Sequence, residues 1–149
     1  MKKVKTLMLG LMAIGAIAIS GCKKEKPAEE IDGSYKGTLV MSVSDKEQGR
    51  LDTTIVLKAE NEETASIFIP AMGEGRMSVP DLTIKGVPVT KASDNLYNLS
   101  ETAVAFTHNN VEWKGSIQGN VNHDKLHLEY TLQPGAMPMS ILFVFDSKQ

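Results

Sequence analysis

The chain has 149 residues, of which 42% are hydrophobic and 23% charged, and its formal net charge is -2. These values are typical of one globular domain with room for a tail. A single cysteine excludes an internal disulfide framework and any zinc site built on two or more thiolates. Sixteen basic residues against eighteen acidic ones argue against a nucleic-acid partner. Because no nucleotide-binding, hydrolase or kinase motif occurs, we expect no catalytic residues, no enzyme activity and no cofactor.

Residues 1–21 predict an export signal. Three lysines at positions 2, 3 and 5 precede residues 7–19, which contain only Leu, Met, Ile, Ala and Gly. A helix of this length spans about 20 Å, short of the ~30 Å hydrocarbon core of a bilayer. A permanent transmembrane helix is therefore the weaker alternative.

The end of this signal, Ile19-Ser20-Gly21-Cys22, resembles the lipobox of bacterial lipoproteins, with Ile19 where Leu is usual. The resemblance implies cleavage before Cys22 and attachment of lipid to its thiol, so that the membrane is a partner through the anchor. An unused thiol behind an ordinary signal is the alternative. Lys23 stands where Asp retains lipoproteins at the inner membrane in the best-studied sorting systems. The resemblance therefore favours an outer-membrane lipoprotein, at the periplasmic face or the cell surface.

Residues 22–30 are expected to form a tether between the anchor and a domain over residues 31–149. The run 23–30 holds six charges, one proline and no large apolar residue, so it lacks the surface needed to order itself. Its charged start also resembles short surface-export signals, but a solvated tether explains it equally well.

From Ile31 onward the apolar residues alternate with period two, which predicts strands. The alternating segments are 33–44, 53–59, 65–69, 82–89, 96–99, 103–107, 111–121, 126–132 and 139–146. We expect a turn over Asp45–Arg50, an irregular excursion over Pro70–Pro80, a bulge at Gly86 and a type II turn at Pro134-Gly135.

Eight to nine strands without a helical stretch predict an all-β fold. An antiparallel eight-stranded up-and-down barrel is the preferred architecture, because closure removes the edges that would otherwise aggregate. A two-sheet sandwich is the alternative. Charges on several outward faces and the lack of aromatic girdles disfavour a transmembrane barrel.

Four segments, in this order, resemble the calycin-like lipoproteins of gut-type Gram-negative bacteria. They are Gly33–Gly37, Ile69–Gly73 with Val79–Ile84, Gly115–Asn120, and Met137–Met139. The resemblance covers nearly all of the mature chain and implies a small barrel shaped like a lipocalin, with no functional residues to transfer. Tyr35 stands where lipocalins place tryptophan, so their ligand chemistry does not transfer directly.

The candidate ligand site lies at the barrel mouth. Met72 and Met77 in the excursion are expected to line it with Trp113, whose strand face also carries Gly115 and Ile117. Two glycines on that face, at positions 115 and 119, are expected to leave space beside the indole. Packing in the core is the more common fate of such residues.

Two functions remain open at this point. One is a binding protein for a small apolar or amphipathic ligand inside the barrel. The other is a non-enzymatic interaction module with a filled core, whose partner is an envelope protein, a glycan or a hydrolase. A cavity in the interior would favour the first and a filled interior the second. No metal site is expected, because about 13 Å of extended chain separates His123 from His127.

Overall fold

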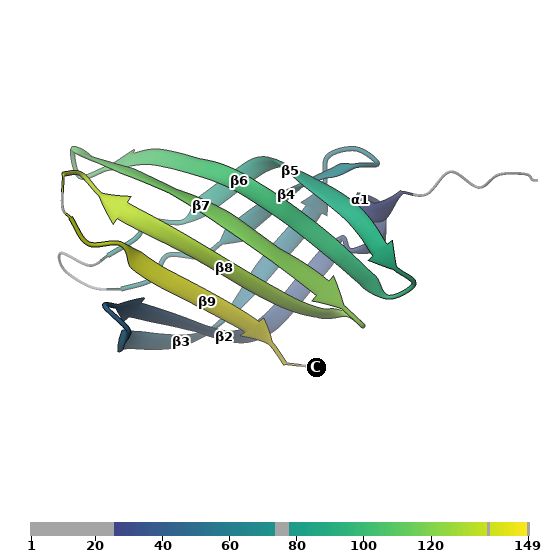
Figure 1. Cartoon of the computed structure of the whole chain (residues 1–149), viewed down its shortest axis with the longest axis horizontal. Helices are drawn as coiled ribbons and strands as arrows, with labels where there is room; N and C mark the ends of the chain where they lie inside the picture. The colour runs from purple at the N-terminus through teal and green to yellow at the C-terminus, as the bar shows by residue number, and fades with distance from the viewer. Residues whose placement is uncertain (1–25, 74–77, 137, 149) are drawn as a thin grey trace, which may run out of the picture.

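The computed structural model describes residues 26–73, 78–136 and 138–148, and forms a closed antiparallel barrel (Figure 1). Its elements are α1 (Pro27–Glu30), β2 (Gly33–Val43), β3 (Lys46–Ala59), β4 (Thr64–Ile69), β5 (Leu82–Ser93), β6 (Leu96–His108), β7 (Val111–Asn122), β8 (Lys125–Pro134) and β9 (Ile141–Ser147). Each strand pairs with the next in sequence, and β9 pairs with β2. The prediction of an eight-stranded up-and-down barrel is confirmed. In the part of the chain described, no helix is long and apolar enough to cross a membrane.

Three hairpins turn on two residues that both have positive φ: Ser44-Asp45, Asn109-Asn110 and His123-Asp124. Two-residue turns of this kind match the twist of the strands they join. The predicted turn over Asp45–Arg50 was wrong, because the chain reverses at Ser44-Asp45 and β3 begins at Lys46. A register shift near Gln48 absorbs the irregularity at this end of β3.

Residues 96–108 form one strand, β6, where we predicted two short ones. The apolar alternation changes parity between Leu99 and Thr102, and the register with β7 shifts at the same place. A bulge therefore explains the interruption in the pattern without ending the strand.

The inward side chains fill the interior of the barrel. The largest fully buried ones are Phe143, Phe145, Ile31, Leu39, Ile55, Leu57, Ile67, Ile69, Ile117, Leu126 and Leu128. At the centre of this core, Tyr130 stacks on Phe143 with ring centroids 4.6 Å apart and an angle of 6° between the planes. The buried side chains form one continuous hydrophobic cluster, which places them in the space that a carrier protein would reserve for a ligand.

Helix α1 covers one end of the barrel, which we call the capped end. Pro27 and Ala28 are buried, and the Ala28 N–H donates a hydrogen bond to the Glu62 carbonyl at 3.1 Å. Ile31 follows as part of the core. The prediction of an unordered tether was therefore wrong for Pro27–Glu30, because the apolar side chains of Pro27 and Ala28 pack against the end of the barrel. The predicted signal peptide, Cys22 and the start of the predicted tether lie outside the described residues.

Tyr35 ties the first strand to this cap. Its hydroxyl donates to the Ile31 carbonyl at 2.7 Å. Burial, together with the nearby carboxylates of Asp124 and Asp32, raises the pKa of Tyr35 to about 12. The phenol therefore stays protonated and keeps this hydrogen bond over the physiological range of pH.

The opposite end of the barrel, which we call the loop end, carries the turns Ser44-Asp45 and Asn109-Asn110 and the segments 70–81 and 135–140. Segment 70–81 joins β4 to β5 and contains an isolated antiparallel bridge between Met72 and Val79. Both residues are buried, so the described part of this excursion packs on the core.

Candidate functional site

In the described residues, the hairpin formed by β4 and β5 pairs with its neighbouring strands only near the capped end. Four residue pairs connect β3 to β4, and four connect β5 to β6. By contrast, eleven pairs connect β6 to β7 and ten connect β7 to β8. Toward the loop end, β3 and β6 therefore each have an edge, on the side of the β4–β5 hairpin, that pairs with no strand among the described residues.

The direction of the β3 amide groups follows from two hydrogen bonds. The Ala59 N–H donates to Asp32, beside β2, at 2.8 Å, whereas the Glu60 N–H donates to Thr64, at the start of β4, at 2.9 Å. Successive residues of a strand direct their N–H and C=O groups to opposite sides. The even-numbered residues of β3 after its bulge therefore direct these groups toward β4.

Pro70 accounts for the early end of the β3–β4 ladder. Extending the register beyond Val56 and Phe68 would place Thr54 opposite Pro70. Proline has no N–H to donate, and it is tolerated in sheets only where a ladder ends or at an edge. In the ranges that the structure describes, the edge of β3 before Val56 therefore has no strand partner on the β4 side.

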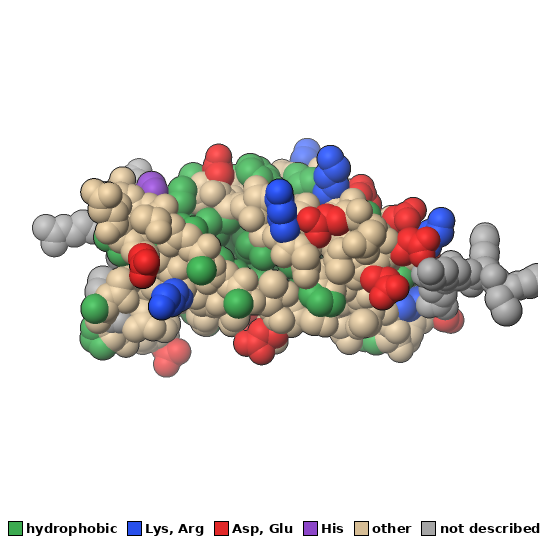
Figure 2. Space-filling model, turned by 90° about the horizontal axis from the view of Figure 1, so that it is seen from above, with side chains coloured by type: hydrophobic (Ala, Val, Ile, Leu, Met, Phe, Trp, Pro, Cys, Tyr) green, Lys and Arg blue, Asp and Glu red, His purple; other side chains and the backbone are tan. Residues whose placement is uncertain are grey.

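Pro88 has the same effect on the other side of the hairpin. The Val89 N–H donates to the Glu63 carbonyl, on the β4 side, at 2.8 Å, so the preceding residue faces β6. The β5–β6 ladder begins at Val89 and Leu99 and goes no further toward the loop end. Strands β5 and β6 lie at the top of the molecule in Figure 1, and Figure 2 shows the molecule from that side. This face is hollowed, and hydrophobic side chains line the hollow.

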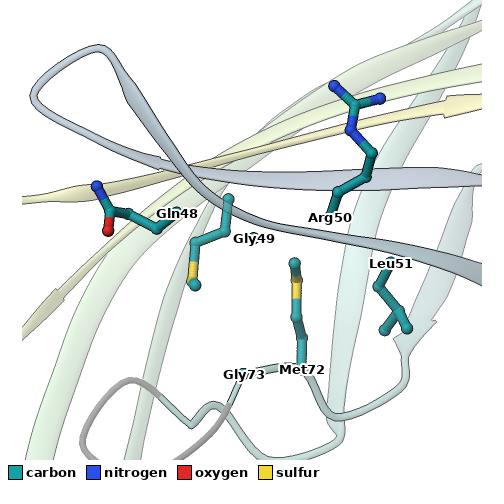
Figure 3. A pocket seen from close by; sticks show the side chains of 7 residues that line it. Gln48, Gly49, Arg50, Leu51, Met72 and Gly73 are labelled. Atoms are coloured by element: carbon teal, nitrogen blue, oxygen red, sulfur yellow. The ribbon is translucent and has the colours of Figure 1, made fainter.

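A pocket of about 400 Å³ lies between β3 and segment 70–81 and opens to solvent. It is lined by Met41, Gln48, Gly49, Arg50, Leu51, Met72 and Gly73. Figure 3 shows Met72 reaching from the segment toward β3, with Gly49 above it and Leu51 to its right. A Cβ at Gly49 would lie 3.6 Å from the methyl carbon of Met41 and 3.8 Å from that of Met72. The pocket is thus floored by flexible thioether side chains, which adapt to varied apolar groups.

The structure separates the residues that we predicted to form one ligand site. Met72 lines the pocket, and Met77 lies outside the described residues. Trp113 is 4% exposed and stacks on Phe106 with ring centroids 5.6 Å apart, while Ile117 is fully buried. Neither residue lines this pocket, so both belong to the packed core.

The expectation of free space beside Trp113 was wrong. A Cβ at Gly115 would overlap the carbonyl oxygen of Thr131, and a Cβ at Gly119 would overlap that of His127. Both glycines allow the backbone of β8 to approach β7 closely, so they mark contact and not a cavity. The Nε1 of Trp113 is buried without a hydrogen-bond partner among the described residues.

A second polar feature, which we did not predict, lies on the outer surface of β8 and β9. Nε2 of His127 is 2.9 Å from Oε2 of Glu129, and Nδ1 is 2.6 Å from Oδ1 of Asp146. The sequence places His127 and Glu129 on one face, but only the β8–β9 register brings Asp146 opposite His127. In the described residues no group of three or more His, Cys, Asp or Glu could hold a metal ion.

His127 is expected to make the stability of the barrel depend on pH. Hydrogen bonds to Glu129 and Asp146 raise its pKa above the ordinary 6.5. Since the folded pKa lies above the unfolded one, the stabilisation is complete below about pH 6.5 and is lost as pH rises through the folded pKa. The difference in unfolding free energy between the wild type and His127→Gln, measured by denaturant titration, should therefore shrink with rising pH. His123→Asn, at an exposed turn position, is the control, and a difference that is constant from pH 5 to 9 would contradict the assignment.

Comparison with known proteins gives a family and a fold. The family model described as a calycin-like beta-barrel domain matches residues 31–148. Among solved structures, a crystal structure of a putative outer membrane protein from Bacteroides fragilis is similar, with a TM-score of 0.69 and 24% identity. The match covers 83% of this chain and 53% of the other, so the chain spans about half the length of that protein. The comparison with curated proteins finds no match.

Proposed function

The chain belongs to the calycin-like β-barrel domain family, and from this fold and the geometry of its loop end we propose that it is a lipid-anchored interaction module of the cell envelope. In this proposal Cys22 carries the anchor, and the barrel binds a partner protein at its loop end without catalysis. The observation that carries the proposal is the combination of a filled interior with two unpaired strand edges at the surface.

The envelope location has two supports. The segment Ile19–Cys22 resembles a lipobox behind a basic and then apolar stretch. A protein of similar fold is described as a putative outer membrane protein. Lys23 favours the outer membrane, and the anchor makes the membrane itself the first partner.

The filled core favours an interaction module over a carrier. A carrier needs interior volume for its ligand, whereas here the rings of Tyr130 and Phe143 stack in that space. The four pockets described, including the one beside Met72, all open at the surface. Contacts with a partner are therefore expected on the outside of the barrel.

A second candidate function is favoured by the pocket between β3 and segment 70–81. Met41, Leu51 and Met72 give it an apolar lining, and Arg50 stands at its rim. This chemistry would suit a small apolar or amphipathic ligand, bound at the barrel wall and not in its interior.

A ligand panel separates the two functions. Under our proposal, fatty acids, bile-acid-like amphiphiles and isoprenoids leave the fluorescence of Trp113 and the Tm of the full-length protein unchanged. A bound ligand would instead raise stability by RT ln(1 + [L]/Kd). The Gly49→Leu variant provides the control, because its side chain would enter the pocket between the two methionine methyl groups. A saturable rise in Tm that Gly49→Leu abolishes would make the second candidate the function.

A further inference from the structure

We propose that the unpaired edge of β3, residues 49–54, receives an extended strand of a partner protein that reads basic, apolar, acidic in its own N-to-C direction. The basic residue lies opposite Asp52, the apolar residue beside Leu51 and the acidic residue opposite Arg50. The inference rests on the proposed function, for which it names the docking surface and the chemistry of the partner.

The backbone of this edge supplies the docking groups. Arg50, Asp52 and Thr54 direct their N–H and C=O groups toward the β4 side, where the ladder begins only at Val56. Among the described residues, no backbone group of the β4–β5 hairpin bonds to these three residues. Three consecutive donor and acceptor sets at a sheet edge form a template for an added strand, and main-chain hydrogen bonds supply the affinity in that mode of recognition.

The outer face of the edge selects the charges of the partner. The side chains of Arg50 and Asp52 are 59% and 78% exposed. Each already has local contacts: Arg50 pairs with Glu47 at 2.8 Å, and Asp52 accepts a hydrogen bond from Thr38 of β2 at 2.9 Å and lies 3.6 Å from Nζ of Lys148. Both side chains stay more than half exposed despite these contacts, and opposite charges across a strand pair stabilise while like charges destabilise.

The inner face of the edge selects an apolar residue between the two charges. Leu51 is 37% exposed, although its neighbours on this face are directed into the barrel. Its side chain borders the pocket floored by Met41 and Met72. In an added strand, the residue opposite Leu51 points to the same face, so an apolar side chain there would enter the pocket.

A partner protein suits this edge better than a second copy of the chain. Two β3 edges paired antiparallel would also set Arg50 opposite Asp52, but that pairing turns the two barrels head to tail. The five residue steps from Cys22 to Pro27 span at most about 17 Å, whereas a tilted strand as long as β3 covers about 35 Å of barrel. Two copies whose barrels stand upright on one membrane surface therefore cannot both reach it in that arrangement.

The test uses the full-length protein in detergent and the peptide Thr-Val-Lys-Leu-Glu-Val-Thr as the probe. Isothermal titration calorimetry should show saturable binding, and hydrogen exchange should slow at the amides of Arg50, Asp52 and Thr54. The same peptide with N-methylated Lys and Glu should bind about 25-fold more weakly, because each lost backbone hydrogen bond is worth roughly a factor of five.

Two variants at one position give the matched control. Thr54→Pro removes an N–H that faces the open edge, while it leaves the ladder with β2 intact, and should weaken peptide binding by about fivefold or more. Thr54→Val keeps the N–H and the β-branched shape, and should bind within about twofold of the wild type. Equal binding to both variants, or no binding of the peptide to the wild type, would overturn the proposal. Dimerisation of the protein alone that Thr54→Pro abolishes would also overturn it, in favour of a second copy.

Photo-crosslinking in cells, from a reactive residue placed at exposed Ala71, separates failure of this inference from failure of the proposed function. A crosslinked envelope protein that is lost in Thr54→Pro and kept in Thr54→Val supports docking at β3. A crosslink that persists in Thr54→Pro leaves the proposed function standing and removes the β3 edge as its site. The absence of any crosslink in the wild type counts against both.

Discussion

The Gly115→Ala substitution is expected to lower the free energy of unfolding by more than about 3 kcal/mol, the upper end of ordinary overpacking. The added Cβ would overlap the carbonyl oxygen of Thr131, which belongs to the backbone of β8 and cannot rotate away. Gly115 pairs directly with Leu132 in the β7–β8 ladder, so relief requires the two strands to separate. Denaturant unfolding followed by circular dichroism measures the loss.

Gly49→Ala is the matched control for this substitution. It also places a methyl group on a strand glycine, but the nearest atoms are methionine methyl carbons at 3.6 and 3.8 Å, which is ordinary van der Waals contact. The variant is expected to be as stable as the wild type or more stable by about 0.4–1 kcal/mol, because alanine restricts the unfolded chain. If Gly115→Ala unfolded at the same denaturant concentration as Gly49→Ala, the close approach of β8 to β7 would be contradicted.

The glycines of β7 show how far the sequence predicts this barrel. Period-two alternation identified β7 and β8 and the inward face that Trp113 and Ile117 share, because burial on one face leaves a local signal. The same pattern suggested that Gly115 leaves a space in the interior. A glycine can leave room either for a ligand or for the backbone of a neighbouring strand. The distance to that neighbouring strand decides between the two, and the alternation within a single strand gives no information on this distance.

The unpaired edges illustrate a second limit. Pro70 and Pro88 are visible in the sequence, and each predicts an interrupted ladder. A proline interrupts the ladder only with the strand toward which its backbone nitrogen is directed. That direction depends on the strand register, which is set by pairing between distant segments of the chain. The site at β3 was missed for this reason, and the region was predicted as a turn because Gly49 follows several polar residues.

The Cys22→Ala substitution is expected to move the protein from the membrane fraction to the soluble fraction. Each buried methylene of a lipid chain contributes about 0.8 kcal/mol, and one myristoyl chain alone gives only marginal binding. Lipoproteins carry several acyl chains on the cysteine that ends the lipobox, so the lipidated protein should remain bound through repeated washing. Cell fractionation followed by immunoblotting measures the shift.

The Lys23→Asp substitution tests in which membrane the predicted anchor places the protein. It leaves Cys22 in place, so the protein should stay in membranes, but it introduces the residue that retains lipoproteins at the inner membrane in the best-studied sorting systems. We therefore expect the variant to move from the outer to the inner membrane. For the wild type, we expect the intact mass to exceed that of residues 22–149 by the mass of several acyl chains. A soluble wild-type protein, or one whose mature chain starts at another residue, would rule out the anchor. In that case the head-to-tail pairing of two β3 edges would lose its main objection, since nothing would hold both capped ends to one membrane.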